Sequence, residues 1–233
     1  MKLRYLLAVV QMLGVLLWSP VNTSAEVVDR IVATAAGKAI SFHSAVVEAN
    51  YQALLSGDSR LQINMEDSLA LETLRPAISR LADQLVIEQL RDRAPLDEPA
   101  MEDETSKVEG MLDELRRNYS TAEEFAQTLV LYGFSEEMLR ARMRRERRIM
   151  LFVDYSLRPQ VHIPVEQVEA YYREQLVPQI QETQQAGQSG AAPPELDQVR
   201  EKIEEILIQR EINKLLDPWL VNLRRERGVR FFD

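Results

Sequence analysis

The sequence contains no cysteine among its 233 residues, so the protein can form neither disulfides nor a cysteine-based metal site. Its only two histidines, His43 and His162, cannot supply a multi-histidine metal site, and neither lies in a spaced cluster with carboxylates. The sequence also lacks a glycine-rich phosphate loop and a Gly-x-Ser-x-Gly turn. It therefore offers no catalytic residue, no metal ligand and no cofactor site, and we do not expect an enzyme.

Glycine is also scarce, with eight residues, whereas leucine, alanine, glutamate, glutamine and arginine, all strong helix formers, are abundant. The spacing of apolar residues and the positions of capping residues predict a mainly helical protein. The predicted helices cover residues 42–55, 68–91, 100–118, 121–132, 136–157, 165–181 and 195–227. Pro76 either kinks the second helix or marks the first turn of a new one, and Pro218 should bend the last.

Local motifs fix several of the predicted helix ends. Ser120 with Glu123, and Thr121 with Glu124, form two overlapping capping boxes. Gly133 suits the left-handed residue that ends the helix, and Phe134 suits the apolar contact that accompanies it. Ser135 should then cap the following helix. We interpret paired carboxylates such as Glu123–Glu124 and Glu204–Glu205 as capping or solvated groups rather than catalytic pairs.

Strand-like segments lie near the two ends of the chain. Val27–Ala33 and Ala39–Ile40 flank a turn at Gly37, and Val229–Phe232 follows the last helix. A two-stranded hairpin is marginal in water, so we expect the C-terminal segment to pair with the N-terminal strand. The predicted fold class is all-α, mainly helical, with a small sheet formed by the N-terminal hairpin and the C-terminal strand. The last helix should pack back on the N-terminal helices and bury Trp219, Leu220, Leu223, Phe231 and Phe232.

The first 25 residues have the pattern of a secretory signal peptide. Lys2 and Arg4 precede an apolar run over residues 5–18, which is shorter than a membrane-spanning helix needs. Small residues follow, and we expect cleavage between Ala25 and Glu26. The alternative is an uncleaved N-terminal anchor. The domain prediction is thus a signal peptide over 1–25 and a single helical domain over 26–233.

The charge balance limits the partners of the mature protein. The formal net charge is −9, and it becomes −11 once residues 1–25, which hold two basic and no acidic residues, are removed. A protein this acidic repels nucleic acid and anionic lipid over most of its surface. We therefore expect no nucleic-acid partner and no stable membrane insertion after signal removal.

Two features of the central helices could still bind a partner. Six arginines fall within nine residues: Arg140, Arg142, Arg144, Arg145, Arg147 and Arg148. They could bind phosphate or nucleic acid, but the acidic net charge favours a structural role. In that role they flank an apolar stripe (Leu139, Met143, Met150, Val153) and pair with carboxylates elsewhere. Methionines in the same helices either fill the core or form an adaptable binding surface.

Motifs follow one another in an order that resembles the SurA family of periplasmic chaperones and their parvulin-type isomerase relatives. The resemblance begins with the strand at 28–33 and continues over 81–87. It is strongest over 119–172, which holds the capped helices and the arginine-rich helix, and it resumes over 199–232. In that family one or two isomerase domains precede the C-terminal helix. Here residues 183–194 have only linker composition, too short for a domain.

The resemblance implies the chaperone module of this family without prolyl isomerase activity. We expect an ATP-independent periplasmic holding chaperone, needing no cofactor, whose partners are unfolded polypeptides such as outer-membrane β-barrel proteins. The alternative is a periplasmic adaptor that docks one folded partner through the same helices. We expect clients to contact exposed apolar side chains of the central helices, namely Met111, Tyr119, Leu131, Tyr132, Phe134, Met138 and Met143.

Overall fold

The computed structural model describes residues 29–63, 69–93, 101–185 and 193–232, without the side chains of 101–104 and 183–185. The protein is mainly helical with a small antiparallel sheet, so the predicted fold class is confirmed. The elements are β1 (Ile31–Ala35), β2 (Lys38–Ser41), α2 (Phe42–Ser56), α3 (Ala70–Arg91), α4 (Met101–Arg116), α5 (Ala122–Tyr132), α6 (Glu136–Leu157), η1 (Arg158–Gln160), α7 (Val165–Tyr171), η2 (Tyr172–Leu176), α8 (Val177–Gln185), α9 (Leu196–Glu226) and β3 (Arg230–Phe231).

The sheet joins the two ends of the described chain, with strand order β2-β1-β3. Ala36 and Gly37 form the turn of the β1–β2 hairpin, and both have positive φ angles, 53° and 76°, as a tight type I′ hairpin turn requires. On its other edge β1 pairs antiparallel with β3, so the predicted pairing of the C-terminal strand with the N-terminal strand is confirmed. The first strand begins at Ile31 rather than at Val27, which lies outside the described residues.

Most predicted helix ends form the expected hydrogen bonds, but the two capping boxes predicted before α5 do not form as such. The Thr121 hydroxyl accepts from the N–H of Glu124, the Glu124 carboxylate accepts from the N–H of Ser120, and no bond between Ser120 and Glu123 occurs among the described residues. Ser41 and Ser44 cap α2 reciprocally, and the Thr121 and Ser135 hydroxyls cap α5 and α6. Gly133 ends α5 with φ 85°. Its N–H donates to Val130 O at 3.1 Å, and the next N–H donates to Leu129 O at 2.8 Å. These two bonds make the expected Schellman motif.

Three prolines lie inside α-helices of the described part of the chain. Pro76 lies within the continuous helix α3 and Pro218 within α9, so Pro76 neither breaks the helix nor starts a new one. Pro178 follows the one-turn π-helix η2, in which the N–H of Val177 donates to Tyr172 O. Proline has no N–H and its ring crowds the carbonyl four residues earlier, so a wider turn before it relieves the clash.

The segment predicted as a linker, residues 183–194, begins later than expected. Helical structure continues past residue 181 through α8 to Gln185, so residues 183–185 are helix rather than linker. Residues 186–192 lie outside the described residues. The prediction missed the extension because it ended the helix at Gln181, where the apolar pattern stops.

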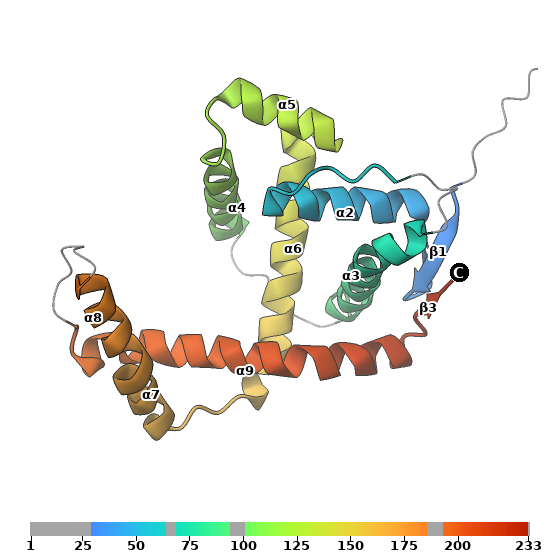
Figure 1. Cartoon of the computed structure of the whole chain (residues 1–233). Coiled ribbons are helices and arrows are strands. Elements are labelled where there is room, and N and C mark those ends of the chain that lie inside the picture. Colours follow the sequence, from blue (N-terminus) through green and yellow to red (C-terminus); the bar gives the residue numbers. More distant parts are fainter. Residues whose placement is uncertain (1–28, 64–68, 94–100, 186–192, 233) are drawn as a thin grey trace, which may run out of the picture.

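The other helices are arranged around the long helix α6 (Figure 1). Helices α4 and α5 lie at its N-terminal end, and the long helix α9 passes its C-terminal end. Helices α7 and α8 lie along the first half of α9 and form an arm that projects from the body. The second half of α9 contacts α3 and leads to β3.

Four apolar clusters stabilise this arrangement. The first lies between the sheet, α2 and α3 and includes Leu223 of α9. The second fills the lobe of α2, α4, α5 and α6, and the third joins α3, α6 and α9 around Phe152. The fourth lies within the arm. Trp219 of α9 packs against both the first and third clusters, so α9 links them.

The last helix packs back on α3 as predicted, but the burial of the final aromatic residues was predicted wrongly. Leu223 is buried, and Trp219 and Leu220 are half-buried. Phe231 and Phe232 are exposed, because β3 lies at the edge of the sheet where no further strand or helix covers it among the described residues. Met150 is likewise exposed, so it does not belong to the apolar stripe that α6 buries.

Candidate functional site: an apolar surface on the α4–α6 lobe

The predicted client-binding residues all belong to one lobe, formed by α4, α5 and the first half of α6 packed on the end of α2. Its core is one cluster of buried side chains: Tyr51, Leu54, Val108, Leu112, Leu115, Phe125, Leu129, Phe134, Leu139 and Met143. Tyr51 and Phe134 meet edge to face, with ring centroids 5.9 Å apart. A packed core of this kind holds the surrounding helix faces in fixed positions.

Two of the seven predicted surface residues are part of that core. Phe134 is 5% exposed and Met143 is 2% exposed, so the prediction that they lie on the surface is wrong. Phe134 turns inward because it follows Gly133 in the Schellman motif and packs in the same cluster as Leu129. Met143 lies one turn beyond Leu139, on the buried face of α6.

The two predicted tyrosines are half-buried and anchor the rim of the lobe. The Tyr119 ring packs against Phe125, with ring centroids 5.2 Å apart. The Tyr132 hydroxyl donates a hydrogen bond to the backbone carbonyl of Asp58, just beyond α2. Each tyrosine presents only part of its side chain to solvent, so the two tyrosines contribute little exposed apolar area.

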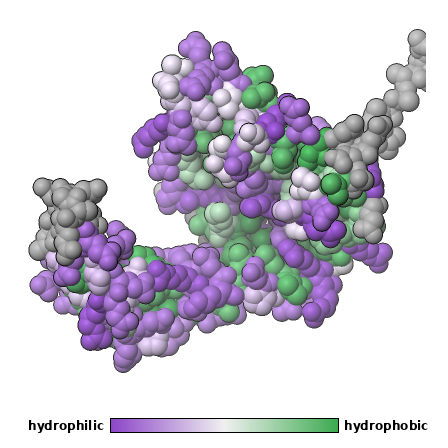
Figure 2. All heavy atoms as spheres, in the orientation of Figure 1, coloured by the Kyte–Doolittle hydropathy of each residue, from purple (hydrophilic) through white to green (hydrophobic). Residues whose placement is uncertain are grey.

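Three predicted residues lie at the surface, as expected. Met111, Leu131 and Met138 are 40%, 57% and 51% exposed. Val130, which the sequence did not single out, is 76% exposed. We name these four residues the lobe apolar surface. Figure 2 shows apolar atoms near the end of α5 among mainly hydrophilic neighbours.

The helices that carry the lobe apolar surface also carry exposed acidic side chains. Asp113, Glu114, Glu123, Glu124 and Glu137 are exposed. Arg116 donates to Asp113 at 2.7 Å and to Glu136 at 2.6 Å. The hydrogen bond from Arg116 lowers the pKa of Glu136, which stays ionised near neutral pH. The lobe therefore presents several exposed carboxyl groups in addition to those that Arg116 binds.

Three of the six arginines of α6 pair with carboxylates among the described residues, in agreement with the structural interpretation. Arg140 donates to Glu109 at 2.7 Å, and Arg145 donates to Glu88 at 2.5 and 3.0 Å. Arg142 forms an ion pair with Glu48. Arg144 and Arg147 differ, because neither forms an ion pair or a hydrogen bond within the described part of the chain.

The pair of Glu48 and Arg142 lies in a polar cluster between α2, α3 and α6. The Glu48 side chain is fully buried and also accepts from Gln52 at 3.1 Å. The Arg142 guanidinium lies 4.4 Å from the centroid of the Tyr51 ring, and burial lowers its pKa. Burial raises the pKa of the Tyr51 hydroxyl, as does Glu146, to which it donates at 2.8 Å. Arg80 of α3 also lies 3.5 Å from the Glu48 carboxylate, so the described partners of Glu48 are all side chains of α2, α3 and α6.

Three further features bear on chemistry in the described structure: the two histidines, potential metal ligands and one pocket. His43 and His162 are exposed and lie on segments that are far apart along the chain. No group of three potential metal ligands occurs among the described residues. A shallow pocket of about 170 Å³ lies between α7, η2 and α9, lined by Tyr171, Arg210 and polar side chains. Within the described helices, none has an apolar stretch of the length a membrane crossing needs.

Comparisons with known proteins add no assignment. No protein-family model, curated protein or solved structure matches the chain.

Proposed function

We propose that the protein is an exported, ATP-independent holding chaperone for unfolded polypeptides, outer-membrane β-barrel proteins among them. The observation that carries this proposal is the lobe apolar surface, in which Met111, Val130, Leu131 and Met138 are exposed on helices fixed by caps and a packed core. Large apolar side chains exposed together on one part of a protein are typical of surfaces that bind other chains.

The chemistry of this surface suits weak and unselective binding. Two of its four residues are methionines, whose flexible, polarizable side chains adapt to different partners. Each side chain that a client covers contributes at most about 1.5–3 kcal/mol. Four partly exposed residues therefore give modest affinity, which allows a client to be released without an energy source.

The sequence pattern supports the place of action. A basic start, a short apolar run and small residues ending at Ala25 are typical of a cleaved export signal. N-terminal sequencing of the protein from a periplasmic fraction should give Glu26 as the first residue. Recovery of intact Met1 in the membrane fraction would favour the uncleaved anchor.

The proposal is tested by diluting a urea-unfolded outer-membrane β-barrel protein into buffer and following light scattering. A molar excess of the chaperone should suppress scattering without ATP. The double variant Val130→Ser with Leu131→Ser should lose most of this effect while keeping its helical circular dichroism. The matched control is Val165→Ser with Val221→Ser, which changes two exposed valines outside the lobe. Unchanged scattering with the wild-type protein would reject the proposal.

One observation favours an adaptor as the second candidate. The lobe apolar surface is small and its helices are rigidly capped, which also suits one folded partner of complementary shape. An adaptor should co-purify with a single protein at a fixed ratio and leave the scattering of unfolded chains unchanged. A holding chaperone should co-purify with many proteins at low and variable ratios.

A further inference from the structure

Arg144 and Arg147 are two arginines of α6 for which the described part of the chain supplies no partner. Both side chains are half-buried, and their Nε atoms are buried without a hydrogen-bond partner among the described residues. Their neighbours Arg140, Arg142 and Arg145 all pair with carboxylates. An Nε–H group that loses water without gaining a partner is unfavourable, while the terminal NH1 and NH2 groups of these two side chains are not buried and can reach an incoming anion.

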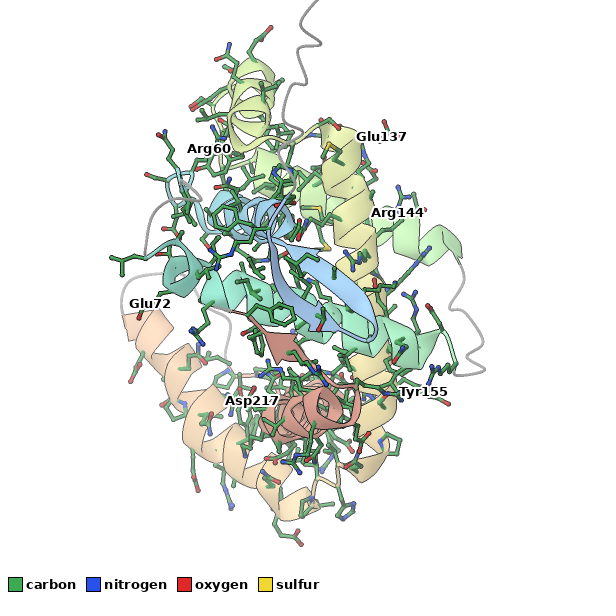
Figure 3. All side chains as sticks on the ribbon, turned by 90° about the vertical axis from the view of Figure 1, so that its right-hand side faces the viewer. Arg60, Glu72, Glu137, Arg144, Tyr155 and Asp217 are labelled. Carbon is green, nitrogen blue, oxygen red and sulfur yellow. The ribbon has the colours of Figure 1, made fainter. Side chains whose placement is uncertain are left out.

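Apolar residues continue the same face of α6. Leu151 and Tyr155 follow Arg147 at successive steps of four residues, the spacing that places side chains above one another on a helix. Tyr155 is 61% exposed, and Leu151 is also exposed. In Figure 3, Arg144 and Tyr155 project from α6 toward the same side of the molecule. We name Arg144, Arg147, Leu151 and Tyr155 the α6 outer face.

We propose that the α6 outer face binds polypeptide segments that carry carboxylates next to apolar side chains. The proposal deepens the proposed holding function, on which it rests, by naming the chemistry of the segments that are held. Arginine binds a carboxylate through two parallel N–H···O bonds, and the planar group also stacks on aromatic rings. Leu151 and Tyr155 would cover the apolar side chains of the same segment.

The negative net charge of the whole chain favours a short acidic peptide over larger anions as the ligand of the α6 outer face. The net charge is −9, so a nucleic acid or an anionic membrane, which spreads its charge over a large area, meets repulsion around the two arginines. A short peptide with one or two carboxylates reaches the α6 outer face without confronting the remaining surface. The exposed carboxyl groups of α4 and α5 favour basic segments on that part of the lobe, whereas Arg144 and Arg147 favour acidic segments on the α6 outer face.

The experiment measures binding of a fluorescent twelve-residue peptide with two glutamates beside leucine and phenylalanine, by fluorescence anisotropy. A matched peptide has glutamine in place of each glutamate. The acidic peptide should bind full-length protein about tenfold more tightly than its glutamine counterpart, as a pair of charge-assisted hydrogen bonds implies. Raising the salt concentration should reduce this preference.

Variants locate the binding site. Arg144→Gln with Arg147→Gln should remove the preference for the acidic peptide, whereas Arg144→Lys with Arg147→Lys should keep part of it and shows that the fold tolerates change there. The matched control, Arg117→Gln with Arg225→Gln, removes the same charge from an exposed position just after α4 and another on α9, and should leave the preference intact. Equal loss in the control variant would reduce the effect to net charge and overturn the proposal.

Other occupants give different results. Equal affinity for both peptides, or competition by inorganic phosphate or duplex DNA at the peptide's own concentration, would overturn the proposal. A dimer that Arg144→Gln with Arg147→Gln dissociates, without peptide binding, would assign the α6 outer face to a second copy of the chain instead. The scattering assay is independent: if it fails while the acidic peptide still binds at α6, the holding function is wrong and this site stands.

Discussion

The guanidinium group of Arg224 donates two hydrogen bonds to the carboxylate of Asp83, each 2.6 Å long. Asp83 belongs to α3 and Arg224 to the last turn of α9, 141 residues later in the chain. Next to this pair, Leu223 enters the core beneath the sheet. The paired geometry fixes the distance and the orientation of the two helices at the point where β3 must begin.

We predict that Asp83→Asn lowers the free energy of unfolding by about 1–2 kcal/mol, because hydrogen bonds to a charged group contribute about this much. The side chain of Asp83 is 15% exposed, so solvent replaces the lost bonds only in part. Urea unfolding followed by circular dichroism measures the change. Glu72→Gln, at an exposed position of the same helix, is the control and should change stability by less than about 0.5 kcal/mol.

The buried pair of Glu48 and Arg142 gives a larger effect. Glu48→Ala would leave Arg142 half-buried and without its carboxylate. Removing one partner of a buried ion pair costs about 3–5 kcal/mol. We therefore predict that the urea midpoint of Glu48→Ala falls well below that of Asp83→Asn.

A double variant separates the cost of the unpaired charge from the cost of the lost volume. Replacing both partners with leucine removes the charge that Glu48→Ala leaves behind, and apolar replacements of buried pairs are often tolerated. We expect the double variant to be more stable than Glu48→Ala. Equal or lower stability would contradict the view that the unpaired guanidinium causes the loss.

The free energy of unfolding should depend on pH through the hydrogen bonds that join the end of α6 to α9. Arg158 donates to Glu205 at 2.7 and 2.9 Å and to Asp154 at 2.8 and 2.9 Å. The hydrogen bonds from Arg158, and then from Gln209, hold the pKa of Glu205 at about 2, below its usual 4.5. A carboxylate with a lowered pKa stabilises the fold above its unfolded pKa, and this stabilisation is lost as the pH falls from about 4.5 to about 2.

Glu205→Gln should therefore be less stable than wild type at pH 7 and should approach it near pH 2. The loss at pH 7 should stay below about 1 kcal/mol, because the Glu205 side chain is half exposed and water screens the pair. Urea unfolding at pH 7 and pH 3 measures the difference. Glu204→Gln, the exposed neighbour, should show no such pH dependence. A constant gap between Glu205→Gln and wild type at both pH values would contradict the assignment.

Local chemistry explains which features the sequence could predict. The hydroxyls of Ser41, Thr121 and Ser135 cap helices because each satisfies N–H groups only three residues away. Gly133 ends α5 because a left-handed residue is needed there and glycine adopts it freely. The pairing of β3 with β1 followed from counting strands, since the hairpin needed a third one.

Tertiary placement explains what the sequence could not predict. Phe134 and Leu131 are both apolar and three residues apart, yet the turn at Gly133 directs one inward and leaves the other exposed. Val130 lies next to the buried Leu129 and faces away from the core, a difference of about 100° around the helix. Glu136, four residues before Arg140 on α6, is one carboxylate partner that the spacing could indicate. The other carboxylate partners, Glu48, Glu88 and Glu109, come from α2, α3 and α4, and no spacing within α6 indicates them.

The last helix and strand should be essential for the fold of the whole chain. Leu223 packs in the core with the sheet and α3, and Trp219 and Leu220 pack against Phe152 of α6. Burial of such side chains contributes at most about 1.5–3 kcal/mol each. Together with the Asp83–Arg224 bonds and the β3 pairing, their loss is comparable to the net stability of a domain, about 5–15 kcal/mol.

We therefore predict that the fragment of residues 26–194 loses cooperative thermal unfolding, whereas residues 26–233 melt in one transition. Circular dichroism at 222 nm during heating measures both. Leu223→Ala in the full chain tests the same contact with less disruption and should cost about 2–4 kcal/mol, since it opens a cavity in a packed core. Val221→Ala, two residues away and exposed, is the matched control and should cost less than about 0.5 kcal/mol. If the fragment melts cooperatively near the temperature of the full chain, α2 to α6 form a core that does not need α9, and the chain consists of two independent parts.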